Sequence, residues 1–129
     1  MIRSYENKDH DEIENMLIKE GIPDKEQCFA LDGFDTYILE DNNEIKGFFT
    51  IKHEKEGVSL QHFCIARQFR NVRNARELMR GVKETVKNMG HNHFIIHPEE
   101  DYLDKMAMYY FKKKPYAIIG RKSFYFVEV

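Results

Sequence analysis

The sequence lacks the features that mark several classes of protein. Its two cysteines, Cys28 and Cys64, form no Cys-x-x-Cys pair, which argues against a disulfide framework and a cysteine-based metal site. No apolar run is long enough to span a membrane, and residues 1–16 carry charges where a signal peptide has its apolar segment. Internal repeats and low-complexity segments are also absent. With six methionines, these absences predict a cytoplasmic protein in a reducing environment.

The residues that are present fit one globular domain. The chain has 129 residues, of which 42% are hydrophobic and 33% charged, enough apolar material for a single buried core. We therefore expect one domain, residues 1–129. The formal net charge is −2 and the isoelectric point about 6.3, whereas dedicated nucleic-acid-binding domains are usually far more basic. Charge thus argues against nucleic acid as a partner and requires any anion-binding site to be local.

The first half of the chain predicts one helix and several strands. Residues 9–21 place Ile13, Met16 and Leu17 on one helical face, with an acidic capping residue before them and a glycine after them. Residues 22–34 are compatible with a short helix or a structured loop. Apolar runs separated by turn residues predict strands near residues 1–5, 35–40, 44–53 and 58–66, the last three forming an antiparallel meander.

The second half alternates helices and strands. After an arginine-rich stretch, apolar residues recur at helical spacing as far as Gly90, and basic residues occupy the opposite face. A short apolar strand is predicted at residues 93–97, an amphipathic helix at 98–114, and strands at 115–120 and 122–129. Because a helix links the fourth and fifth strands, these two are expected to be parallel. The sequence therefore predicts an α/β fold with a mixed, mostly antiparallel sheet flanked by helices and splayed between strands four and five.

The stretch between these halves, RQFRNVRNARELMRG at residues 67–81, holds five arginines and no lysine. It runs from the end of a strand into a helix, whose N-terminus presents free backbone amides and a partial positive charge. Such an end, supplemented by arginine, binds phosphate well. The alternative is a helix with a basic solvent face. That alternative accounts better for the later cations than for those that precede or open the helix, Arg67, Arg70 and Arg73.

The order of the elements and two motifs resemble the GNAT superfamily of N-acyltransferases. The superfamily's signature Q/R-x-x-G-x-G/A, whose backbone amides bind the pyrophosphate of coenzyme A, falls on residues 70–75. Arg70 and Ala75 match it, while Arg73 replaces the middle glycine. Near the end of the chain, MYYFKKKPYAIIG is similar to the superfamily's F-Y-x-x-x-G-F segment, with Tyr110-Phe111 at its F-Y pair. Short GNAT-like proteins of tailed phages, which lack the glycines, are similar in size and layout.

The resemblance implies a GNAT-like fold that transfers an acyl group from acetyl-CoA to an unidentified amine. The residues implied in coenzyme binding are Cys64, Ile65, Ala66, Arg70, Asn71, Val72, Arg73, Asn74 and Ala75. Such a transfer needs a base for the amine and an acid for the departing thiolate. In many members the acid is the tyrosine of the F-Y pair, whose position here holds Phe111, so the neighbouring Tyr110 is the candidate. His62 is the candidate base, with Glu54 and Glu56 as alternatives.

Each candidate also has a structural interpretation. Tyr110 lies on the apolar stripe of its predicted helix, which favours a core position. A lone histidine in a strand, such as His62, is more often buried and hydrogen-bonded than catalytic. Cys64 is expected to be a buried, unreactive thiol. The histidines within residues 91–97 lack the further ligands of a recognised metal site, so no metal is expected.

Three functions follow from these observations. The first is an acyl-CoA-dependent N-acetyltransferase that acts on a small-molecule or protein amine, with acetyl-CoA as co-substrate. The second is a catalytically inactive GNAT-fold binding or structural module, for example a phage accessory or virion protein, which the glycine-free loop and Phe111 motivate. The third is nucleic-acid binding through the arginine stretch. It is the least favoured of the three, because the chain is acidic and few aromatic residues interleave these arginines.

Overall fold

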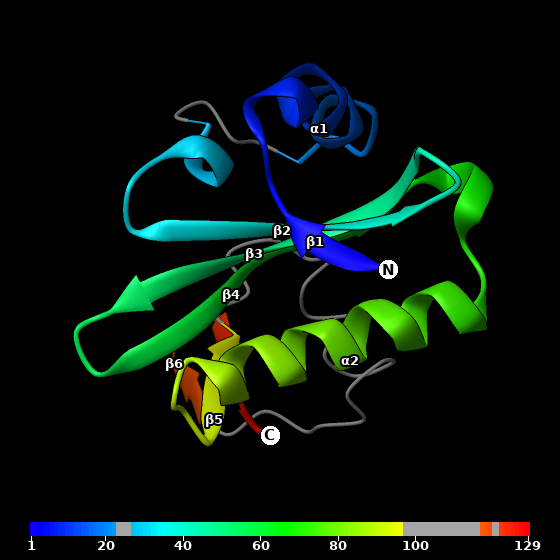
Figure 1. Cartoon of the computed structure of the whole chain (residues 1–129). Helices are drawn as coiled ribbons and strands as arrows, with labels where there is room; N and C mark the ends of the chain where they lie inside the picture. The colour runs from blue at the N-terminus through cyan, green and yellow to red at the C-terminus, as the bar shows by residue number, and fades with distance from the viewer. Residues whose placement is uncertain (23–26, 97–116, 120–121) are drawn as a thin grey trace.

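The computed structural model describes residues 1–22, 27–96, 117–119 and 122–129, and it shows one mixed sheet with helices on both faces (Figure 1). In these residues seven strands lie in the order β1-β2-β3-β4-β5-β7-β6. Their bounds are β1 Ile2–Ser4, β2 Phe34–Asp41, β3 Glu44–Glu54, β4 Gly57–Ile65, β5 His93–Ile96, β6 Ala117–Ile119 and β7 Lys122–Glu128. The described α-helices are α1 His10–Lys19 and α2 Val72–Asn88.

The predicted meander is confirmed in its position and pairing. Strands β1 to β4 are successive antiparallel neighbours, and β2, β3 and β4 begin and end within about a residue of their predicted bounds. The turn between β2 and β3 contains Asn42 and Asn43 at φ values of 53° and 63°. Asparagine tolerates this left-handed region, and a two-residue type I′ turn requires it at both positions.

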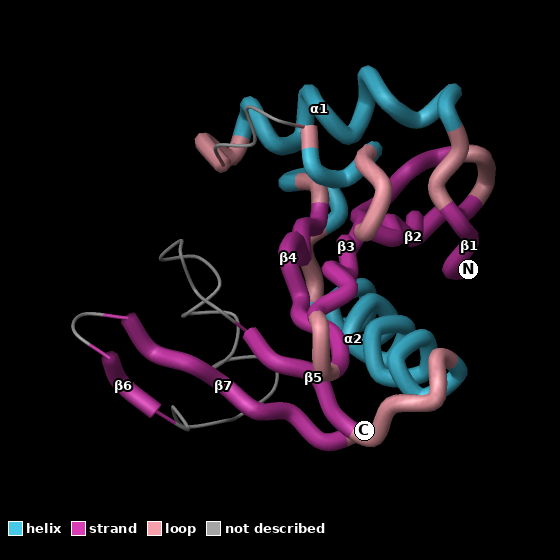
Figure 2. The backbone as a smooth tube through the Cα atoms, turned by 90° about the vertical axis from the view of Figure 1, so that its left-hand side faces the viewer, coloured by secondary structure: helices cyan, strands magenta, loops and turns pink. Residues whose placement is uncertain are grey.

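The parallel pair of strands is short. β4 and β5 are in register only at Ser59 with Ile95 and at Leu60 with Ile96 among the described residues. The next residue of β4, Gln61, is extra relative to β3 and forms a bulge. β5 ends at Ile96, the second of these pairs, whereas β4 continues to Ile65, and the two strands run in different directions (Figure 2). The predicted mixed sheet, with its splay between strands four and five, is confirmed.

The two helices cover opposite faces of the sheet (Figure 1). The core cluster on the α1 side includes Ile13, Leu17, Phe29, Phe48 and Cys64. The larger cluster on the α2 side includes Phe49, Ile65, Leu78, Val82 and Phe94. Phe69, which follows β4, packs against both clusters. The connection from β4 to α2 is therefore anchored in the core on both sides of the sheet.

Some predicted elements fall partly or wholly outside the described residues. Between α1 and β2 the structure contains one 3-10 turn, Cys28–Ala30, where the sequence allowed a short helix or a loop. The helix predicted at residues 98–114 lies outside the described residues. None of the helices that are described combines the length and the apolar character needed to cross a membrane.

Candidate functional site

The arginine stretch begins as a compact turn between β4 and α2. A single 3-10 turn, Arg67–Phe69, follows the strand, and Asn71 then caps α2. Asn71 Oδ1 accepts a hydrogen bond from the amide of Asn74 at 2.8 Å, and Asn74 Nδ2 donates to the carbonyl of Phe69 at 2.7 Å. Asn74 is buried. Two side-chain amides, the exposed one of Asn71 and the buried one of Asn74, thus fix the shape of the turn.

This turn is built without glycine because none of its residues adopts a left-handed conformation. Arg70 has φ −74° and Asn71 has φ −156°. The side chains of Asn71, Val72 and Arg73 are exposed and so do not fill the turn's interior. The described non-glycine residues with positive φ are Gln27, Asn42 and Asn43, all outside the turn. The glycines of the GNAT signature are therefore not needed here for backbone conformation.

At the start of α2, two backbone amides are available to a ligand. The amide of Asn74 is bonded to Asn71 Oδ1, and the amide of Ala75 donates to the Asn71 carbonyl at 3.1 Å. The amides of Val72 and Arg73 have no acceptor within the part of the chain that is described. They lie at the positive end of a 17-residue helix, where an anion is favoured. Of the four amides of residues 72–75, those of Val72 and Arg73 are thus the two available to an anion.

Arg67 and Arg70 contact the C-terminal end of α1. Glu20 Oε1 accepts from Arg67 Nε at 2.9 Å, and Glu20 Oε2 lies 2.8 Å from Arg70 Nη2. Arg70 Nε also donates to the Ile65 carbonyl at 3.0 Å. Burial acts to raise the pKa of Glu20, but Arg70 and Arg67 outweigh it and lower that pKa below its ordinary value. A charged Glu20 therefore ties the turn to α1, a role that no sequence spacing indicated.

His62 and Cys64 lie on the sheet face that α1 covers. Both are buried, and the His62 ring meets Phe48 edge to face at 6.2 Å between centroids. Burial and the charge of Glu20 raise the pKa of the Cys64 thiol to about 11, against the opposing effect of Arg70. The prediction that this thiol is buried is confirmed, and its raised pKa favours the protonated, less reactive form. His62 directly follows the bulge, two residues after Leu60, which is the last residue of β4 paired with the described part of β5.

The other candidates for proton transfer are placed less favourably or not described. Tyr110 and Phe111 lie outside the described residues. Glu54 and Glu56 lie at the hairpin between β3 and β4, and Glu54 Oε1 accepts from Ser59 Oγ at 2.9 Å. This hairpin is at the opposite end of β4 from α2, a separation of about 25 Å along the strand. Of the candidate bases, His62 is nearer to the start of α2.

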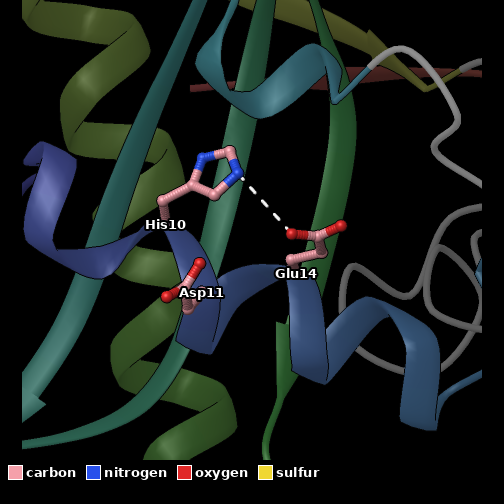
Figure 3. Close-up of side chains that lie close together, drawn as sticks. All are labelled: His10, Asp11 and Glu14. Atoms are coloured by element: carbon pink, nitrogen blue, oxygen red, sulfur yellow. Dashed lines mark ion pairs between the residues drawn. The ribbon is translucent and has the colours of Figure 1, made fainter.

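One group of side chains with metal-ligating atoms was not expected from the sequence. His10, Asp11 and Glu14, at the start of α1, each bring one such atom within 4.8 Å of the others (Figure 3). His10 Nε2 lies 3.6 Å from Glu14 Oε2, and Nδ1 lies 3.2 Å from the Tyr5 hydroxyl. Both ring nitrogens are therefore occupied, and acidic residues are favoured at a helix N-terminus. These contacts explain the group as part of the helix start, and we assign it no metal.

Solved structures place this architecture among known folds, whereas no family model and no curated protein matches the sequence. PaiA N-acetyltransferase from Thermoplasma acidophilum, in complex with coenzyme A, is 11% identical, with 100% of this chain and 98% of that chain covered and a TM-score of 0.74. Ribosomal-protein-S18-alanine N-acetyltransferase from Escherichia coli is 14% identical, with 98% and 90% covered and a TM-score of 0.72.

A larger protein is matched in part. This chain covers 61% of an aminoglycoside 6′-N-acetyltransferase complexed with coenzyme A, with 75% of this chain aligned, 14% identity and a TM-score of 0.63. At such identities the likeness establishes the fold. The chain has the fold of the GNAT superfamily, as its motifs predicted, and the three structures described above are of acetyltransferases, two of them with coenzyme A bound.

Proposed function

We propose that this protein is an acetyl-CoA-dependent N-acetyltransferase that acts on an amine still to be identified. One observation carries the proposal: β4 continues past Leu60, its last pair with the described part of β5, and leads directly into the turn that presents the available amides of Val72 and Arg73. Coenzyme A consists of an extended arm with amide groups and a pyrophosphate. A diverging strand suits the arm, and a helix N-terminus suits the pyrophosphate.

The implied coenzyme-binding residues divide into three roles in this proposal. The backbone of Cys64, Ile65 and Ala66 borders the arm, because these residues connect the splay to the turn. The amides of Val72 and Arg73 bind the pyrophosphate, with added charge from the exposed Arg73 side chain and the half-exposed Arg70 side chain. The remaining residues shape the site: Asn71 and Asn74 fix the turn, and the buried Ala75 packs the start of α2 against the core.

The chemistry proposed is direct transfer. The nitrogen of the neutral amine attacks the thioester carbonyl, and the resulting tetrahedral intermediate expels the thiolate of coenzyme A. His62 is the proposed acceptor of the amine's proton because it lies beside the bulge, just past the last described pair of β4 with β5. Tyr110 is the proposed donor to the thiolate, on the resemblance of its segment to the F-Y motif.

Two observations favour a second candidate, a GNAT-fold binding module without catalysis. Phe111 stands where the motif has its tyrosine, and it cannot donate a proton. Arg67 and Arg70 are both engaged by Glu20, which neutralises part of the positive charge near the turn. Such a module would keep the fold and a binding surface but transfer no acyl group.

Binding of the coenzyme is the first test. Acetyl-CoA at about 100 times its Kd is expected to stabilise the folded protein by about 2.7 kcal/mol, which a thermal melt detects readily. Arg73→Glu is expected to weaken binding at least about tenfold, because repulsion replaces a favourable phosphate contact. Lys87→Glu makes the same change of charge at the far end of α2 and is the matched control. Equal affinities for the two folded variants would remove the proposed pyrophosphate site.

Catalysis is tested with Tyr110→Phe, assayed on a panel of small amines and peptides. Loss of a positioned general acid is expected to lower kcat by about 10²–10⁴-fold while coenzyme affinity is unchanged. Coenzyme binding without transfer to any acceptor would support the binding module. Failure to bind coenzyme at all would leave only the GNAT fold.

A further inference from the structure

The outward side of α2 carries an unbroken row of cations, which we call the α2 stripe: Arg73, Arg76, Arg80, Lys83 and Lys87. All five are exposed, and their spacing alternates between three and four residues. At 100° per residue they fall within an arc of about 80°, opposite the buried Leu78 and Val82. No other residue of the helix lies in this arc. α2 covers one face of the sheet (Figures 1 and 2), and because the stripe is exposed and lies opposite the buried side of the helix, it faces away from the sheet.

The acidity of the whole chain conceals this local charge. Residues 67–88 contain seven arginines and lysines but only two acids, Glu77 and Glu84, and so carry a net charge of +5. Because the chain as a whole carries −2, the remaining residues carry −7. The two glutamates lie beside the arc and not within it. The overall charge therefore does not argue against a polyanionic partner, because α2 gathers its cations on one side of the helix.

The stripe repels itself. Each of its cations has another three or four residues away, and like charges at that spacing destabilise a helix by about 0.2–0.5 kcal/mol per pair. Among the described residues, Arg73, Arg76, Arg80 and Lys87 form no ion pair, whereas Arg3, Arg67 and Arg70 all do. A bound polyanion would remove this repulsion.

The composition of the stripe indicates which polyanion. Protein interfaces are centred on apolar and aromatic side chains, and a membrane-surface helix inserts its apolar face. The stripe has no apolar or aromatic member, and the apolar face of α2 is buried in the core. Single-stranded nucleic acid is usually held by stacking on aromatic rings, which the stripe also lacks. A double helix is different, because its phosphate backbone can be bound by charge alone.

We propose that the α2 stripe binds the phosphate backbone of double-helical nucleic acid without regard to sequence. From Arg73 to Lys87 the stripe is about 21 Å long, which matches about six base-pair steps. Three of its five cations are arginines, which bind phosphate through paired donors. This role goes beyond the proposed acyl transfer and does not depend on it.

The test is fluorescence anisotropy with labelled duplex DNA and duplex RNA, each longer than the stripe, over a range of salt concentrations. Five phosphate contacts predict that log K falls with log salt at a slope of about −4.5. The double variant Arg76→Gln/Arg80→Gln should weaken binding about tenfold at low salt and reduce the slope by about 1.8. The variant Lys8→Gln/Lys55→Gln removes the same charge from exposed sites outside α2 and should leave both unchanged.

Four results would overturn the proposal. The first is weak binding of both duplexes, with a Kd of about 100 μM or higher for each at low salt. The second is an equal loss of affinity in the stripe variant and its control. The third is equal competition by polyglutamate or anionic vesicles, which would identify an acidic protein or a membrane as the partner. The fourth is a lower Tm for the stripe variant than for its control, which would show that the chain already neutralises the stripe.

Discussion

At the scale of single residues, Thr36 joins β2 to the segment before it and to β3. Its Oγ1 donates to the Phe29 carbonyl at 2.9 Å and lies 2.9 Å from Thr50 Oγ1. Because the single hydroxyl hydrogen of Thr36 is used on the carbonyl, Thr50 must be the donor in the second bond. Both threonines are buried, so water cannot replace either partner. One hydroxyl therefore satisfies two buried groups.

Thr36→Val is expected to lower the free energy of unfolding by about 1–3 kcal/mol, because it leaves both the carbonyl and the Thr50 hydroxyl unsatisfied. Thr50→Val is the matched control, since it keeps the Thr36–Phe29 bond and should cost less. Urea unfolding of the two variants measures the difference. A cost for Thr50→Val equal to or above that for Thr36→Val would contradict this assignment of donors.

The residues proposed for the site illustrate what sequence reasoning reaches at this scale. Cys64 was expected to be buried, and it is, because its strand is covered on both faces. The side-chain amides of Asn71 and Asn74 were expected only to lie in the anion-binding turn. Their hydrogen bonds, which make the turn stable without glycine, depend on a backbone conformation that the sequence motif does not encode.

At the scale of elements, two glycines allow close packing for different reasons. A Cβ added to Gly47 of β3 would lie 2.6 Å from the Cys64 carbonyl oxygen, an atom of the neighbouring backbone. A Cβ added to Gly81 of α2 would meet Ile2 Cγ1 at 3.0 Å and Phe49 Cε1 at 3.3 Å, which belong to side chains. The first contact can be relieved only by moving a strand, whereas the second needs a small side-chain adjustment.

Gly47→Ala is therefore expected to destabilise the protein by about 2 kcal/mol, in the range of other overpacked sites. Gly81→Ala makes the same chemical change and should cost less, since alanine in a helix regains up to about 1 kcal/mol of helix propensity. Thermal and denaturant unfolding compare the two variants directly. If both substitutions lower the free energy of unfolding by the same amount, the close approach of β3 to β4 at Cys64 does not limit packing.

At the scale of the whole molecule, ion pairs join segments far apart in the chain. Arg3 of β1 binds the Asp9 carboxylate through two nitrogens, at 2.8 and 2.9 Å, and Glu40 of β2 through one at 2.7 Å. Hydrogen bonds from Arg3 lower the pKa of Asp9 below its ordinary value of 3.8, despite burial of the carboxyl group. Glu20 likewise joins α1 to the turn before α2.

These lowered pKa values set the direction of the pH dependence. A carboxyl group whose pKa is lower in the folded than in the unfolded protein stabilises the fold above its ordinary pKa. That stabilisation is lost as the pH falls through the folded value. The free energy of unfolding is therefore expected to fall as the pH drops below about 4, because the unfolded chain binds protons at Asp9 and Glu20 more readily than the folded protein does.

Asp9→Asn should cost roughly 3 kcal/mol at pH 7, because it leaves a partly buried arginine without its main partner. The difference from the unmodified protein should shrink as the pH falls below about 4. Asp11→Asn, at an exposed position on α1, is the control and should have a smaller effect. Stability curves measured against pH check both statements. A cost for Asp9→Asn that is constant from pH 7 to pH 2 would rule out this linkage.

The sequence by itself predicted the meander, the helices α1 and α2 and the parallel pairing of β4 with β5, whereas the GNAT fold was predicted from a resemblance of motifs. The predictions of helices and strands follow from regularities between residues near one another in the chain, such as the apolar spacing of α2 or the asparagines between β2 and β3. Local backbone geometry imposes these regularities, so they can be read without a structure.

Only the tertiary structure decided how the candidate site is assembled. It showed that two amides at the start of α2 are available, that His62 lies on the α1 face, and that Glu20 engages arginines 47 and 50 positions later. Contacts of this kind form when packed helices and strands bring distant segments together. Their free energy comes from burial and charge in three dimensions, which no spacing along the chain records.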